Sequence, residues 1–114
     1  MPAADTKTKL LFVCSRNRWR SATAEALLKN HRRYAARSAG TANSARVKVT
    51  PGLIGWAEVI FCMEEKHLER LRERFGEKLA GKTLITLRIP DDYGFMDPEL
   101  IDLLRTELAP YLEL

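Results

Sequence analysis

The chain has 114 residues, 46% of them hydrophobic and 30% charged, a composition that indicates one soluble globular domain. No apolar run approaches the roughly 20 residues that a membrane-spanning helix needs, and the N-terminus lacks the apolar centre of a secretory signal. We therefore expect a cytoplasmic protein without membrane partners, with a flexible tail at 1–8 and a single domain at 9–114. Its two cysteines, Cys14 and Cys62, do not indicate a disulfide framework.

The net charge of +4 is unevenly distributed. Residues 1–50 contain 11 Lys or Arg and two Asp or Glu, a balance of +9, whereas residues 51–114 contain eight and 13, a balance of −5. A basic half favours an anionic ligand such as a phosphate group or a nucleic acid.

The first half of the chain predicts two strands around one helix. The continuous apolar run "KLLFVC" (9–14) is typical of a buried strand. The segment 21–34, rich in alanine and leucine, predicts a helix with Ser21 as its N-cap. A second strand is expected at 35–41, and the polar segment 42–50 has no regular pattern.

The second half continues the alternation of helices and strands. The expected elements are a short helix at 51–57, a strand at 57–63, an amphipathic helix at 64–76, a strand at 82–90 and a final helix at 97–112. Two pairs, Thr50–Pro51 and Asp97–Pro98, supply an N-cap followed by a first-turn proline for the first and last of these helices. We expect both histidines, His31 and His67, to be solvated within charged stretches.

Alternating strands and helices predict a three-layer α/β/α fold with a four-stranded parallel sheet. Ligands of such sheets bind beyond the carboxyl ends of the strands. Cys14 ends the first predicted strand, and Asp91 and Asp92 follow the last one. These residues should therefore meet at one edge of the sheet.

The stretch "CSRNRWRS" between the first strand and the first helix carries the strongest functional signal. Cys14 and Arg20 form a C-x5-R pattern, followed by Ser21. The loop between them can curl with its N–H groups inward, and such a nest beside a helix N-terminus binds an oxyanion. Arg20 adds a bidentate fork, and the same positive field favours a thiolate. The pattern predicts a nucleophilic cysteine at the floor of a phosphate-binding loop. The loop residues are Ser15, Arg16, Asn17, Arg18, Trp19 and Ser21.

Two of these residues have expected supporting roles. The Ser21 hydroxyl would donate to the sulfur, and the Asn17 side-chain amide would hold the shape of the loop. Because C-x5-R also occurs by chance, a second interpretation stays open at this point: a buried cysteine ending a strand, a capping serine and exposed arginines.

The stretch "LFVCSRNRWRSATAEALL" resembles the opening of the low-molecular-weight protein tyrosine phosphatases. Their signature is cysteine, any residue, glycine, asparagine, two further residues, arginine and serine, which Cys14, Asn17, Arg20 and Ser21 match. Later segments resemble the family in the same order: "SAGT" at 38–41, "WAEVIFCM" at 56–63 and "IPDDYGF" at 89–95. The resemblance covers 9–114 and implies the same fold.

The resemblance implies a phosphomonoester hydrolase that forms a cysteinyl-phosphate intermediate and needs no metal or cofactor. Cys14 would attack phosphorus, Arg20 would bind the phosphoryl oxygens, and Asp91 would be the general acid that later activates water. Tyr93 aligns with an aromatic residue of the pocket wall. The implied partners are a phosphotyrosine protein or small aryl phosphate and, in its place, a phosphate or sulfate ion.

The loop departs from the family pattern at three positions. Arg16 replaces the loop glycine, which alters the backbone path if that position requires a positive φ. Arg18 stands where an apolar pocket residue is usual. Trp19 replaces the second cysteine of the family loop, and we expect it to pack under the first helix rather than on the pocket rim.

Two further departures concern the acid and the pocket. Asp92 replaces the proline after the general acid, so it competes with Asp91 for that role. The family has a longer segment where this chain has only 42–50, which predicts a shallow, open pocket. Basic residues on its rim would favour a substrate more acidic than a simple phosphotyrosine.

Two other functions compete with hydrolysis. One is a non-catalytic module that binds an anion or a nucleic acid through the loop arginines and Trp19, although one tryptophan for base stacking is thin support. The other is an arsenate reductase on the same fold. That chemistry needs a resolving thiol, which would be either Cys62 within a predicted strand or an external thiol such as glutathione.

Overall fold

The computed structural model describes residues 6–114, so most of the predicted tail lies outside the described residues. Thr8, assigned to that tail, already begins the first strand. The elements follow in the expected order. They are β1 (Thr8–Cys14), α2 (Arg20–Leu27), β2 (Tyr34–Gly40), α3 (Pro51–Trp56), β3 (Val59–Cys62), α4 (Glu65–Phe75), the 3-10 helix η1 (Gly76–Leu79), β4 (Thr83–Thr86) and α5 (Pro98–Leu108).

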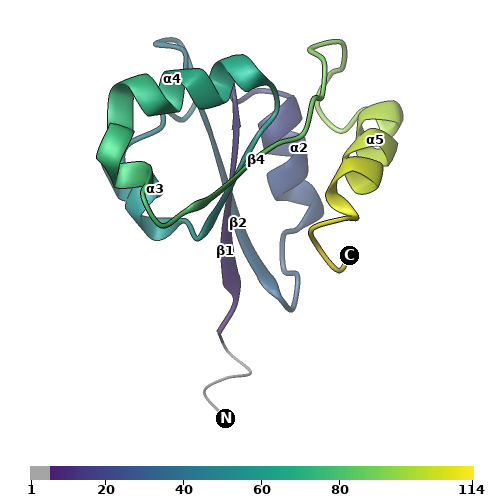
Figure 1. Ribbon diagram of the computed structural model, residues 1–114. Helices are drawn as coiled ribbons and strands as arrows, with labels where there is room; N and C mark the ends of the chain where they lie inside the picture. The colour runs from purple at the N-terminus through teal and green to yellow at the C-terminus, as the bar shows by residue number, and fades with distance from the viewer. Residues whose placement is uncertain (1–5) are drawn as a thin grey trace.

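Within residues 6–114 the strands form a four-stranded parallel sheet in the order β2-β1-β3-β4. The central strand β1 pairs on both sides, with Val13 opposite Ala39 of β2 and Cys62 of β3. Helices α2 and α5 pack on one face of the sheet, and α3 and α4 pack on the other (Figure 1). This arrangement confirms the predicted three-layer α/β/α fold.

The strand β1 is buried on both faces, as its continuous apolar run predicts. Leu10, Phe12 and Cys14 face the cluster under α2 and α5, whereas Leu11 and Val13 face the cluster under α3 and α4. Because side chains alternate along a strand, this register alone determines on which face the cysteine at the end of β1 lies.

The first helix differs from the prediction at both ends. It ends at Leu27 rather than at 34, and Asn30 takes a left-handed backbone with φ of 65°, which turns the chain toward β2. Ser21 is not the N-cap, because the helix already begins at Arg20 and Trp19 occupies the cap position without a side-chain hydrogen bond. The Ser21 hydroxyl is instead engaged with Cys14 and Asn17.

The two other predicted N-caps, Thr50 and Asp97, are as expected. The Thr50 hydroxyl accepts a hydrogen bond from the Leu53 N–H, and the Asp97 carboxylate accepts one from the Glu99 N–H. The fourth strand, by contrast, ends at Thr86 rather than at 90. Arg88 has a φ of 61°, and this left-handed residue interrupts the extended conformation beyond the end of β4.

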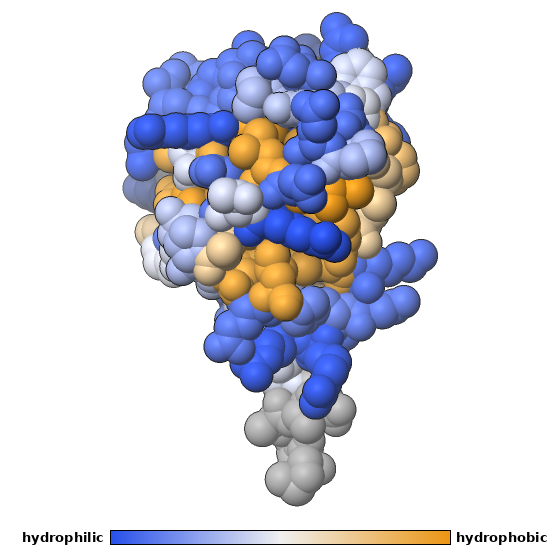
Figure 2. Space-filling view, turned by 90° about the vertical axis from the view of Figure 1, so that its right-hand side faces the viewer, coloured by the Kyte–Doolittle hydropathy of each residue, from blue (hydrophilic) through white to orange (hydrophobic). Residues whose placement is uncertain are grey.

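Helix α5 packs its apolar stripe, Leu100, Leu104 and Leu108, against the sheet. Figure 2 shows the side of the molecule that carries this helix, where apolar surface lies between polar side chains. Among the described residues no helix has the length and apolar character needed to span a bilayer.

Candidate active site

The C-x5-R loop lies at the carboxyl edge of the sheet, as predicted. Cys14 is the last residue of the central strand β1, and Arg20 is the first residue of α2. Both are almost completely buried, with exposures of 3% and 2%. The sulfur and the guanidinium are thus placed by rigid elements, and only residues 15–19 are loop.

The carbonyl groups of residues 14–17 all point toward one neighbouring segment, 41–46. The bonds are Thr41 N–H to Cys14 O (2.9 Å), Ala42 N–H to Ser15 O (2.9 Å), Arg46 N–H to Arg16 O (3.0 Å) and Arg46 Nε–H to Asn17 O (3.0 Å). Since these carbonyls are turned away from the sulfur, the loop can direct N–H groups toward the space above it. The Asn17 N–H does so, donating to Cys14 Sγ at 3.2 Å.

The segment 42–50 therefore has a role that its irregular sequence does not reveal. It supplies the donors that hold the loop carbonyls outward, through Ala42 and Arg46. A short connection thus supports the loop from outside without covering the pocket mouth.

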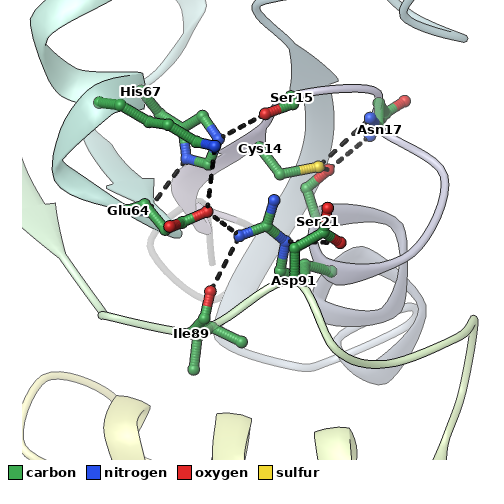
Figure 3. A network of polar contacts seen from close by, with 10 residues as sticks. Cys14, Ser15, Asn17, Ser21, Glu64, His67, Ile89 and Asp91 are labelled. Atoms are coloured by element: carbon green, nitrogen blue, oxygen red, sulfur yellow. Dashed lines mark hydrogen bonds and ion pairs between the residues drawn. The ribbon is translucent and has the colours of Figure 1, made fainter.

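A second set of contacts joins Asn17, Ser21 and the sulfur of Cys14. The Asn17 side-chain amide donates to Ser21 Oγ at 2.8 Å, and Ser21 Oγ lies 2.9 Å from Cys14 Sγ (Figure 3). The bond from the amide leaves the serine its own hydrogen, which it can donate to a Cys14 thiolate, because a thiolate can only accept. Asn17 Oδ1 is buried without a hydrogen-bond partner among the described residues.

Asn17 is also the residue that takes the left-handed conformation in the loop, with a φ of 58°. Asparagine tolerates this region better than most residues. Arg16 does not have a positive φ, so its substitution for the family glycine requires no change of backbone path.

Arg20 is held inward by two acceptors beyond the loop. One of its terminal nitrogens donates to Glu64 Oε1 at 2.5 Å and to the carbonyl oxygen of Ile89 at 2.9 Å (Figure 3). The hydrogen bond from Arg20 holds the pKa of the Glu64 carboxyl below its usual value. Sequence reasoning missed Glu64, although it follows β3 at the same sheet edge, which was the available signal.

A pocket of about 400 Å³ opens above the sulfur. Its lining residues come from the loop and from the segment after β4: Cys14, Ser15, Arg16, Trp19, Arg20 and Asp91. Asp91 Oδ1 lies 3.7 Å from Arg20 Nε, whereas Asp92 does not line the pocket. The structure thus brings together Cys14, Arg20 and Asp91.

Three other expected site residues are placed differently from the prediction. Trp19 is 42% exposed on the pocket rim rather than packed under the helix, because its neighbours Arg20 and Ser21 turn inward and leave it on the outer side. Arg18 lines a neighbouring pocket. Tyr93 is half-buried against the apolar cluster under α5 and does not line the pocket above the sulfur.

The comparisons with known proteins agree with this geometry. No protein-family model and no curated protein matches the chain. Solved structures do match: the tyrosine phosphatase Wzb from Escherichia coli K30 in complex with phosphate is 22% identical with a TM-score of 0.70, covering 93% of this chain and 96% of that chain. SP-PTP, a low molecular weight protein tyrosine phosphatase from Streptococcus pyogenes, is 17% identical with a TM-score of 0.69, covering 93% and 94%.

The YwlE arginine phosphatase from Geobacillus stearothermophilus is 23% identical with a TM-score of 0.61, covering 94% of this chain and 99% of that chain. The chain has the low-molecular-weight protein tyrosine phosphatase fold.

The prediction that His67 is exposed to solvent is wrong. His67 is completely buried rather than solvated, because α4 turns its first-turn residue toward the loop. Its Nδ1 accepts from the Glu64 N–H at 3.0 Å, and its Nε2 lies 2.9 Å from Ser15 Oγ. Burial, followed by the nearby charge of Arg20, lowers the pKa of His67 to about 4.

Cys62 lies on the opposite face of the sheet from Cys14. Burial raises the pKa of its thiol to about 12. Cys62 is therefore not expected to act as a nucleophile, and it cannot reach Cys14.

Proposed function

We propose that the chain is a cysteine-dependent phosphatase that hydrolyses phosphate monoesters of the phosphotyrosine type. One observation supports this proposal above all. The sulfur of Cys14 stands beneath a loop whose carbonyls are bonded outward and whose arginine is held inward. A tetrahedral oxyanion is the ligand that such a set of donors suits.

The first chemical step would transfer the phosphoryl group to sulfur. The Cys14 thiolate attacks phosphorus, the S–P bond forms, and the bond from phosphorus to the leaving oxygen breaks. Arg20 and the loop N–H groups stabilise the charge on the phosphoryl oxygens. Donors to the sulfur, from the Asn17 N–H and the Ser21 hydroxyl, stabilise the thiolate before the attack and again when it leaves.

Asp91 is the candidate for both proton transfers. It lines the pocket mouth, so its protonated carboxyl can give a proton to the leaving oxygen. In the second step the resulting carboxylate takes a proton from water as the water oxygen attacks phosphorus. The S–P bond then breaks, which releases inorganic phosphate and returns the thiolate.

The residues at the pocket mouth indicate the class of substrate. Arg16 and Trp19 lie at the pocket mouth, a cation beside an exposed aromatic ring. Such a rim suits an aryl phosphate on an acidic chain. Neighbouring structures are named for tyrosine or arginine phosphatase activity, so phosphoarginine belongs in the same substrate panel.

The test is hydrolysis of p-nitrophenyl phosphate by the wild-type chain and by Cys14→Ser. We expect vanadate-sensitive turnover by the wild type and none by the variant, with phosphotyrosine peptide turned over in the same way. Phosphate or RNA binding without turnover would instead identify a non-catalytic binding module. Arsenate reduction would need an external thiol such as glutathione, because Cys62 on the other face of the sheet cannot resolve an adduct on Cys14.

A further inference from the structure

We propose that Ser15 is a further residue that donates a hydrogen bond to the bound phosphoryl group, and that His67 is the positioning residue that leaves the Ser15 proton free for this contact. The inference rests on the proposed function, because it names a donor of the same pocket. It starts from the one bond that the Ser15 side chain makes among the described residues, to His67.

The tautomer of His67 is determined by its main-chain neighbour. The Glu64 N–H can only donate, and it meets His67 Nδ1 at 3.0 Å. Nδ1 must therefore be the bare nitrogen, and the ring proton resides on Nε2. Complete burial at the start of α4 leaves no water to compete for either nitrogen.

The direction of the next hydrogen bond follows. His67 Nε2 carries the proton, so it donates to Ser15 Oγ across 2.9 Å. A serine hydroxyl has one hydrogen to donate, and the bond from His67 does not use it. Ser15 lines the pocket above Cys14, where the remaining acceptor would be an oxygen of the bound anion.

The electrostatics of the surroundings keep this arrangement in place. A charged His67 would present a second N–H to the Glu64 N–H, which is repulsive. Burial and the positive charge of Arg20 both oppose that charged form, and the pKa of His67 is lowered to about 4. The ring thus stays neutral under the conditions in which a phosphatase is assayed near neutral pH.

Glu64 contacts both Arg20 and His67. Its carboxylate holds Arg20, and its main-chain N–H holds His67 (Figure 3). The side chain of Glu64 therefore orients Arg20. Its main-chain N–H orients His67, which in turn holds Ser15. A side chain without a hydroxyl at Ser15 would lose only the second of these contacts.

The experiment is a double-mutant cycle on the full chain with Ser15→Ala, His67→Leu and the combined variant. The readouts are the affinity for inorganic phosphate, measured as competitive inhibition or by calorimetry, and kcat/KM for p-nitrophenyl phosphate. We expect each single variant to lose about 10-fold or more in both, as for a hydrogen bond to a charged group. The combined variant should lose no more than either single one.

Two further variants separate positioning from folding. His67→Gln keeps an acceptor for the Glu64 N–H and a donor for Ser15, so it should recover most of the phosphate affinity lost in His67→Leu. Thr106→Ala, which removes an exposed hydroxyl from α5, should behave as wild type. Thermal unfolding identifies any variant that does not fold.

Unchanged phosphate affinity in a folded Ser15→Ala variant would overturn the inference, as would losses that add in the combined variant. A wild type that binds phosphate without hydrolysing esters would refute the proposed function, yet the cycle on phosphate affinity would still decide the role of Ser15. A wild type that does neither overturns both.

Discussion

Gly40 and Ser15 approach each other so closely that no side chain fits between them. A Cβ at Gly40 would lie 2.4 Å from the carbonyl oxygen of Ser15 and 2.8 Å from the Cβ of Ala45. The end of β2 and the start of the C-x5-R loop are therefore in backbone contact, and the shape of the loop depends on this glycine.

Gly40→Ala should consequently push the loop away from its supporting segment. We expect a loss of about 1–3 kcal/mol in the free energy of unfolding, the range for overpacking at a rigid contact, together with reduced phosphate affinity. Urea unfolding and phosphate titration measure the two effects. Gly55→Ala in α3, where the new methyl group meets nothing within 4 Å, is the matched control and should be neutral or slightly stabilising. Equal behaviour of both variants would contradict this account.

The acid assignment can be tested by comparing adjacent carboxylates. Asp91→Asn should lower turnover of esters with poor leaving groups by about 100-fold or more, the usual contribution of general acid catalysis, and affect p-nitrophenyl phosphate much less. Asp92→Asn, which changes the same charge outside the pocket, should have a small effect on both substrates. A reversed pattern across a leaving-group series would show that Asp92 is the acid, and equal effects of the two variants would refute the assignment to Asp91.

The two cysteines should differ sharply in reactivity. Cys14 accepts hydrogen bonds from the Asn17 N–H and the Ser21 hydroxyl and opens to a pocket, whereas burial raises the pKa of Cys62 to about 12. Iodoacetate at pH 6 should therefore label Cys14 well before Cys62, and inorganic phosphate should protect it. Peptide mapping by mass spectrometry measures both rates. Preferential labelling of Cys62, or no protection by phosphate, is the result that would refute the pocket geometry.

Glu64→Gln should weaken the pocket through Arg20. The variant keeps the size of the side chain and removes the charge that holds the guanidinium. Because a displaced binding group costs up to ~100-fold in rate, we expect kcat/KM to fall at least about 10-fold. Glu65→Gln, one residue further along and not bonded to Arg20, provides the control. Full activity of Glu64→Gln would mean that the charge of Glu64 is not needed to position Arg20.

The buried histidine should make folding sensitive to mild acid. The folded pKa of His67, about 4, lies below the ordinary value of 6.5. The unfolded chain therefore binds a proton between these values that the folded chain does not. Stability should be unaffected above pH 6.5 and fall as the pH decreases toward 4, by on the order of 3 kcal/mol in total. Urea unfolding between pH 4 and 7 measures this slope, which His67→Gln should largely abolish. An identical slope in the variant would assign the effect to other groups.

The parts of the fold that sequence patterns predicted are those with a local signal. Apolar strand runs, the Thr50 and Asp97 caps and the C-x5-R spacing each depend on residues close together in the chain. The parallel sheet with helices on both faces then followed from general rules of connection, whereas the strand order β2-β1-β3-β4 was seen only in the structure. The contact between Asn17 and Ser21 was also accessible, because both belong to one loop and the helix turn after it.

The parts that were missed depend on residues far apart in the chain. Arg46 holds the carbonyl of Asn17, and His67 reaches Ser15 from a different strand-helix unit. Nothing in a charged helical stretch distinguishes a buried histidine from a solvated one until α4 is placed over the loop. Trp19 was misjudged for a similar reason, since an aromatic residue beside two inward-turning neighbours looks apolar in sequence but lies outward in space.

The placement of the two thiols on opposite faces of the central sheet has a consequence for oxidative damage. If peroxide converts Cys14 to a sulfenic acid, no other thiol of the chain lies on the same side to condense with it. Recovery would then require a small-molecule thiol entering through the pocket mouth, and prolonged exposure would drive the sulfur to its irreversible sulfinic form. A phosphate ion bound in that pocket mouth would protect the Cys14 sulfur from the oxidant.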